Sequence, residues 1–210
     1  MSRVPHRRTS CRAVSCCLAL AAAALLAVML TPPALAARVH VRVEGKTRTL
    51  FGPTEPRLTV TANALDALER ASAAGEFYYH VAGTSLGPYV DQIGRFAAGG
   101  AAGWVFKVNG ASPPVGADQT RLKDGDRLLW YWATFGPASG PQTLRLVRQR
   151  SGCYRVLAED DGGARSPAVG ATLTVDGRRV RTRAGRACVG PHRGVVRAVR
   201  AGSVRSNALR

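Results

Sequence analysis

Two aromatic-rich segments in the middle of the chain constrain its fold more than any other feature. Residues 103–110 (Gly-Trp-Val-Phe-Lys-Val-Asn-Gly) have the pattern of a strand that ends in an Asn-Gly turn, the strongest short hairpin signal. Residues 127–133 (Arg-Leu-Leu-Trp-Tyr-Trp-Ala) have the pattern of another strand. A sheet with one helix packed across it is the simplest way to bury such faces, so we expect this architecture.

The residues before these strands predict the rest of that sheet and its helix. Residues 38–44 alternate strictly, with three valines on one face and Arg42 on the other, which predicts a half-buried strand. Residues 47–51 are expected to return as the second arm of a hairpin, and residues 58–61 to form a short strand. Asn63 is placed as the N-cap of a short helix with one apolar stripe.

The N-terminus has the three parts of a secretory signal peptide. Residues 1–16 carry four arginines and no acid, residues 17–30 are apolar, and residues 34–36 (Ala-Leu-Ala) supply the small-x-small pattern of a cleavage site. We therefore expect residues 1–36 to direct export, and the protein to be secreted or held at the cell surface. The apolar run is shorter than a membrane span, and its retention as an anchor is the alternative that stays open.

A linker over residues 136–142 (Gly-Pro-Ala-Ser-Gly-Pro-Gln) is expected to separate two domains. Residues 37–135 are then an α+β domain with one helix. Residues 143–210 contain short apolar stretches separated by turns, which predicts a small β-sandwich. The predicted fold class is therefore mainly β, with an α+β domain followed by an all-β domain.

The net charge of +17 is concentrated in the last part of the chain. Residues 37–140 hold 11 basic and 9 acidic side chains, whereas residues 141–210 hold 15 arginines and 4 acids. Such a charge suits anionic polymers of a cell envelope, including teichoic acids, acidic glycans, lipid headgroups or DNA. A solvated, arginine-rich surface produced by a GC-rich genome is the alternative, and nucleic acid is not our expected partner.

Two cysteines remain after the expected signal, Cys153 and Cys188. An even number in an exported chain predicts one disulfide within the second domain. A redox or metal pair is the functional alternative. The spacing does not favour it, because there is no Cys-x-x-Cys motif and His192 is the only histidine nearby.

Four motifs, in order, resemble the transcobalamin-like C-terminal domain family. They are residues 63–70 (Asn-Ala-Leu-Asp-Ala-Leu-Glu-Arg), 89–94 (Tyr-Val-Asp-Gln-Ile-Gly), 103–110 and 122–131 (Leu-Lys-Asp-Gly-Asp-Arg-Leu-Leu-Trp-Tyr). The resemblance implies a β-grasp domain related to soluble ligand-binding modules. Animal relatives cover one face of cobalamin, which implies a corrinoid as one ligand class, although those carriers also need a helical barrel domain. Residues 143–210 resemble, more loosely, carboxypeptidase-regulatory-like or Ig-like accessory modules.

The aromatic side chains of these motifs are the candidate ligand-binding residues: Trp104, Phe106, Trp130, Tyr131, Trp132 and Tyr89. Alternation places Trp104 and Phe106 on one face, and Trp130 and Trp132 on the face opposite Tyr131. Two interpretations stay open: one set packs in the core, and the exposed remainder is a surface on which a flat ligand can stack.

No catalytic or metal-ligating arrangement is evident in the sequence. His40, His80 and His192 have no evident carboxylate or cysteine partner, and no pair of residues has metal-ligand spacing. A phosphate-binding glycine motif is also missing. We therefore expect a noncatalytic protein with no metal and no cofactor, apart from the corrinoid that the resemblance suggests.

The sequence thus predicts a secreted binding protein whose β-grasp domain recognises a small ligand, with corrinoids as the family-suggested example. The alternative is a cell-surface or envelope interaction module. Such a module would bind anionic polymers or a protein partner through its positive second domain.

Overall fold

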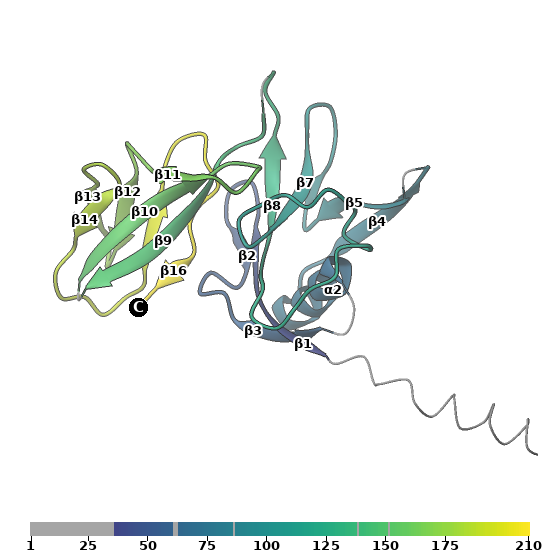
Figure 1. Cartoon of the computed structure of the whole chain (residues 1–210), viewed down its shortest axis with the longest axis horizontal. Helices are drawn as coiled ribbons and strands as arrows, with labels where there is room; N and C mark the ends of the chain where they lie inside the picture. Colours follow the sequence, from purple (N-terminus) through teal and green to yellow (C-terminus); the bar gives the residue numbers. More distant parts are fainter. Residues whose placement is uncertain (1–35, 61–62, 86, 138, 151) are drawn as a thin grey trace, which may run out of the picture. The chain divides into compact units, whose positions relative to one another are not determined.

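The computed structural model describes residues 36–60, 63–85, 87–137, 139–150 and 152–210 (Figure 1). The expected signal sequence, up to residue 35, lies outside the described residues. In the described part of the chain, no helix is long and apolar enough to cross a membrane. Residues Ala36–Arg210 form one compact unit, and the expected division into two domains stays a prediction.

A five-stranded mixed sheet carries the aromatic strands. It consists of β1 (Ala37–Glu44), β2 (Thr49–Phe51), β3 (Arg57–Val60), β7 (Ala102–Val108) and β8 (Arg127–Thr134). β1 pairs antiparallel with β2 and β3 and parallel with β8, and β8 pairs antiparallel with β7. A parallel pair of first and last strands with a helix across one face is a β-grasp-like arrangement, as expected.

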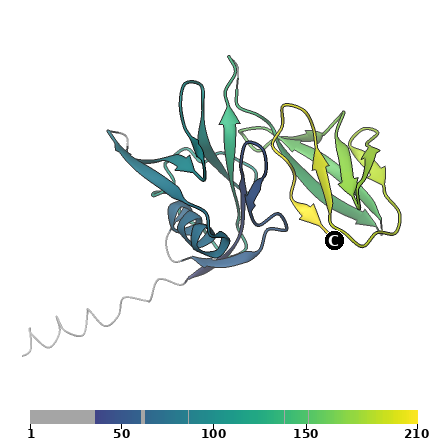
Figure 2. The ribbon, with the colours of Figure 1, turned by 180° about the vertical axis from the view of Figure 1, so that it is seen from behind.

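Helix α2 (Ala64–Gly75) packs on one face of this sheet (Figure 2). The side-chain oxygen of Asn63 accepts the backbone N–H groups of Leu65 and Asp66 at 3.1 and 3.0 Å, so the predicted N-cap is confirmed. Its buried face is mostly alanine, which lets the helix approach the sheet closely. The helix includes Gly75, and a left-handed Glu76 terminates it.

A second, small sheet lies beside the helix-covered face. Its strands are β4 (Tyr79–Thr84), β5 (Gly87–Ile93) and β6 (Phe96–Ala97). Val90 and Ile93 of β5 are buried in the same hydrophobic cluster as the valines of β1 and the tryptophans Trp104 and Trp130. This packing holds β5 against the aromatic strands.

The opposite face of β1 is exposed only at its start, at Arg38, whereas its second half is covered, contrary to the half-buried strand predicted from its alternation. Arg42 and Glu44 are only 2% and 1% exposed. Residues from the last third of the chain cover them: Arg42 donates to the backbone oxygen of Arg205 at 2.9 Å, and the guanidinium groups of Arg197 and Arg205 bond to the Glu44 carboxylate. The charges on this face therefore form ion pairs within the protein.

Two four-stranded sheets form a small β-sandwich, as predicted for the last 70 residues. One sheet contains β9 (Thr143–Arg150), β10 (Cys153–Glu159), β11 (Arg165–Pro167) and β14 (Arg186–Cys188). The other contains β12 (Thr172–Val175), β13 (Arg178–Arg181), β15 (Val196–Val199) and β16 (Ala208–Leu209). Their inner faces share one hydrophobic cluster, which includes Leu146, Val156, Leu173 and Val196. The predicted disulfide joins Cys153 and Cys188, which lie directly opposite each other on β10 and β14.

Candidate ligand-binding site

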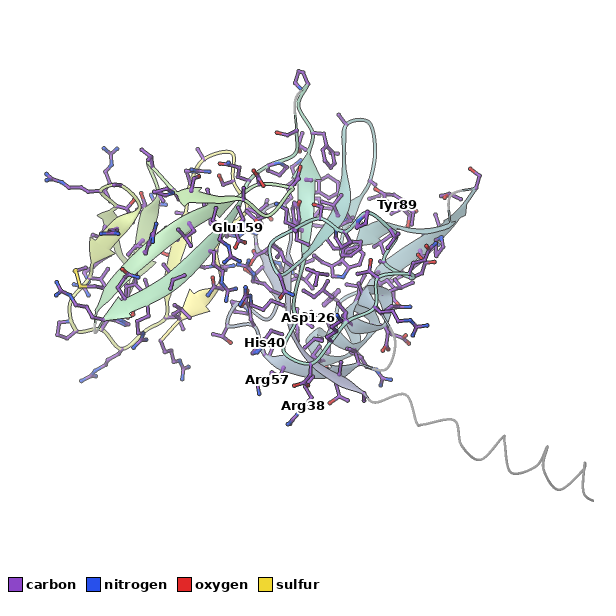
Figure 3. The ribbon with its side chains drawn as sticks, viewed as in Figure 1. Arg38, His40, Arg57, Tyr89, Asp126 and Glu159 are labelled. Atoms are coloured by element: carbon purple, nitrogen blue, oxygen red, sulfur yellow. A yellow bond between two sulfur atoms is a disulfide. The ribbon has the colours of Figure 1, made fainter. Side chains whose placement is uncertain are left out.

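A cavity of about 230 Å³ opens beside the aromatic strands. Trp104 and Phe106 of β7, Trp130 of β8 and Tyr89 of β5 line it, together with residues of the loop that follows β7. Figure 3 labels Tyr89 on its strand. The structure therefore brings together four of the six candidate ligand-binding residues.

Strand register explains why these rings gather. Trp104 lies opposite Trp132, and Phe106 lies opposite Trp130, so all four side chains share the helix-covered face of the sheet. The rings of Phe106 and Trp130 stack with their centroids 4.9 Å apart and an interplanar angle of 30°. One wall of the cavity is therefore a stacked aromatic pair.

The two buried tryptophans are fixed in orientation by hydrogen bonds. The indole N–H of Trp104 donates to the backbone oxygen of Phe96 at 2.8 Å, and that of Trp130 donates to the oxygen of Ala64 at 3.4 Å. Trp104 and Trp130 are 1% and 2% exposed. Both therefore belong to the core as well as to the cavity lining: they fix the shape of its walls, while Phe106 and Tyr89 are the more accessible rings.

Tyr89 differs from the tryptophans because it is 40% exposed. Its neighbour Val90 is buried and anchors the strand, whereas the Tyr89 ring can be reached from solvent. Among the candidate residues, Tyr89 is therefore the side chain that can be changed with the smallest loss of core packing.

The cavity is electrically neutral. None of the residues that line it carries a charge, and the polar side chains among them are the hydroxyls of Tyr89 and Ser112. Such a lining favours a ligand with a mostly apolar surface and one or two groups that form hydrogen bonds.

Tyr131 and Trp132 do not join the cavity. Tyr131 faces the other side of the sheet, where the Nζ atom of Lys107 lies 5.9 Å from its ring centroid, and burial raises the pKa of its hydroxyl. Trp132 packs edge-on against Trp104 at 5.6 Å and lines a separate hollow of about 280 Å³ with Lys46 and Arg205. Neither residue therefore lines the cavity.

One histidine has a carboxylate partner that the sequence did not reveal. The Nδ1 atom of His80 lies 2.7 Å from the Oδ1 atom of Asp91, on the neighbouring strand β5. A register shift beside His80 sets this pairing, and local spacing does not predict such a shift. Both side chains are substantially exposed, and within the described residues no three His, Cys, Asp or Glu side chains form a group that could hold a metal ion.

The comparisons with known proteins agree with the motifs. Residues 61–134 match a family described as Domain of unknown function (DUF4430), which is the transcobalamin-like domain family that the motifs resemble. The match covers α2 and the strands β4 to β8, and therefore all four side chains that line the cavity from these strands. No curated protein matches the chain.

Proposed function

We propose that this is a noncatalytic binding protein whose aromatic cavity takes a small neutral ligand, or the flat edge of a larger one. The observation that carries the proposal is the preorganised lining of Trp104, Phe106 and Trp130, with the accessible ring of Tyr89 beside it. Stacked rings with fixed orientation bind flat apolar surfaces without losing side-chain entropy.

The size of the cavity limits the ligand. At about 230 Å³ it lies below the roughly 300–1,000 Å³ typical of pockets that enclose a drug-sized molecule. A single ring system would be enclosed, whereas a corrinoid would insert only a substituent or one edge. Corrinoids therefore remain one member of the proposed class, supported by the family to which residues 61–134 are similar.

We also propose that the protein acts outside the cytoplasm and that it catalyses no reaction. Residues 1–36 have the pattern of an export signal, so we place the protein outside the cytoplasm, secreted or at the cell surface. The lining of the cavity has no carboxylate, imidazole or thiol that could act as a base or nucleophile. The β-sandwich over residues 143–210 is then an accessory unit.

Binding of a neutral aromatic probe tests the proposal. N-phenyl-1-naphthylamine should show saturable fluorescence enhancement with a Kd of about 1–10 µM, or roughly −8 to −7 kcal/mol. The Kd should not change with salt, because no charge lines the cavity. Failure to saturate at any soluble concentration of the probe would contradict the proposal.

Cyanocobalamin then tests the corrinoid member of the class. Displacement of the bound probe by cyanocobalamin, with heat in titration calorimetry, would assign corrinoids to the cavity. If the probe binds while millimolar cyanocobalamin neither displaces it nor gives heat, the ligand is a smaller aromatic or apolar molecule.

A further inference from the structure

The proposed binding in the aromatic cavity does not involve the positively charged edge of the β-sandwich. All arginines of the segment 178–186 are exposed: Arg178, Arg179, Arg181, Arg183 and Arg186. Strand β13 pairs only with β12 in the described residues, so it is the edge of its sheet. A tight turn, closed by the bridge between Arg183 and Arg186, then leads into β14 of the other sheet. The segment therefore carries its charge around one edge of the sandwich.

The acids of this part of the chain are used elsewhere. Glu159 pairs with Arg165 at 2.8 Å, and Asp161 lies 3.3 Å from the Nζ atom of Lys107. The side chain of Asp160 accepts a backbone N–H at 2.9 Å. The carboxylate of Asp176 accepts the backbone N–H groups of residues 193 and 194, and the nearby charge of Arg178 also acts on it at longer range than an ion pair. In the described part of the chain, no ion pair therefore neutralises the arginines of 178–186.

Two of the arginines also face each other directly. Arg155 of β10 and Arg186 of β14 are cross-strand partners, an arrangement in which like charges destabilise a sheet. The Nε atom of Arg155 is buried and has no hydrogen-bond partner within the described residues. An anion bound beside Arg186 would offset the repulsion between these two guanidinium groups.

A hollow of suitable size lies beside Arg186. It has a volume of about 510 Å³ and is lined by Gln149, Arg150 and Arg186 beside the Cys153–Cys188 disulfide. Two guanidinium groups and an amide are the donors with which proteins hold phosphate oxygens, because the planar fork of Arg binds two oxygens at once.

We propose that the hollow and β13 together bind a linear polymer that carries repeated phosphate groups. One phosphate would lie between Arg150 and Arg186, and its neighbours along the polymer would meet the exposed arginines of β13. A lipid surface is the less suitable occupant. The segment 178–186 has no exposed large apolar side chain to insert, and Val180 packs against the core of the sandwich.

Titration with long-chain inorganic polyphosphate tests this inference on the full chain. Two triple variants lose the same charge: R179Q/R181Q/R186Q at the proposed site, and R38Q/R48Q/R121Q at exposed positions elsewhere. The second should melt like the wild type, and the first at the same temperature or slightly higher, because it removes the charge that faces Arg155. The site variant should bind at least tenfold more weakly in about 50 mM NaCl, and log K should fall less steeply with log salt. The control should stay within threefold of the wild type.

Three results would overturn the inference. The first is that the wild type shows no saturable binding of polyphosphate, and the second is that both triple variants lose affinity for polyphosphate equally. The third is that the protein binds phosphatidylglycerol vesicles tightly and polyphosphate does not displace them. The last result would assign the edge to a membrane surface. Because the site is separate from the aromatic cavity, Tyr89→Ala should leave polyphosphate binding unchanged, so failure here and failure of the cavity proposal are distinguishable.

Discussion

The hydroxyl oxygen of Tyr89 lies over Gly103, only 2.5 Å from the position that a β-carbon on this glycine would occupy. Gly103 is buried in β7, directly before Trp104. The absence of a side chain at residue 103 therefore lets the Tyr89 hydroxyl lie against β7, the strand that supplies Trp104 and Phe106 to the cavity.

Gly103→Ala should displace Tyr89 and weaken binding of N-phenyl-1-naphthylamine about five- to tenfold, or about 1–1.4 kcal/mol. Gly99→Ala is the matched control, since a β-carbon there meets nothing within 4 Å. Fluorescence titration of both variants measures the effect. Equal affinities for G103A and G99A would show that the position of Tyr89 does not matter for binding.

Glu44 is the central acceptor of the buried charges on the far face of the sheet. It accepts from Thr49 and Arg205 at 3.0 Å each and from Arg197, and it is 1% exposed. Glu44→Gln leaves buried guanidinium groups without their counter-charge, so the free energy of unfolding should fall by about 3–5 kcal/mol. Urea unfolding measures this. Glu69→Gln, on the exposed side of α2, should change it by less than about 0.5 kcal/mol. A loss below about 1 kcal/mol for E44Q would contradict the role given to Glu44.

The disulfide closes a loop with a sequence separation of 35 residues. In the chain-entropy model a loop of this length contributes about 4 kcal/mol to folding. Replacing Cys153 and Cys188 together by serine should therefore lower the melting temperature by several degrees or more. Reductant should lower it in the wild type but not in the double variant. If both proteins melt alike without reductant, the bond does not stabilise the fold.

The hydrogen bonds of Asp176 should make the stability of the protein depend on pH below about 4. Its carboxylate accepts the backbone N–H groups of Arg193 and Gly194, which lowers its pKa below the ordinary 3.8. Because the folded-state pKa is the lower one, the stabilisation is complete above about pH 4 and is lost as the pH falls through the folded value. The difference in melting temperature between the wild type and Asp176→Ala should therefore shrink as the pH drops below about 4. A difference that stays constant down to about pH 2 would contradict this assignment.

Local features of the fold could be predicted because local chemistry sets them. Asn109 and Gly110 both have positive φ angles, 54° and 97°, which few other residue pairs accept, and Val108 pairs with Ala111 across the turn. The N-cap Asn63 follows the same logic, whereas the disulfide was predicted from the even number of cysteines in an exported chain. Strand β13 has no such local signal, because an edge strand rich in arginine buries too little apolar surface to show a periodic pattern.

The long-range features could not be predicted, because they depend on register and on segments far apart in the chain. Arg42 meets Arg205 across 163 residues, so the alternation of residues 38–44 shows where the polar side chains lie but not what covers them. The aromatic residues were recognisable as a group. Alternation alone predicted that Tyr131 lies on the face opposite Trp130, and this is confirmed, but which of the aromatic residues form the cavity depends on the pairing of Phe106 with Trp130.

A matched pair of tyrosine variants decides whether ligands bind in the aromatic cavity. Tyr89 and Tyr78 are 40% and 59% exposed, but only Tyr89 of the two lines the cavity. Titration of N-phenyl-1-naphthylamine should give an affinity at least fivefold weaker for Tyr89→Ala than for the wild type, and an unchanged affinity for Tyr78→Ala, while both variants melt as the wild type does. Equal affinity in all three proteins, or no saturable binding in any of them, would contradict the claim that the aromatic cavity is the site of recognition.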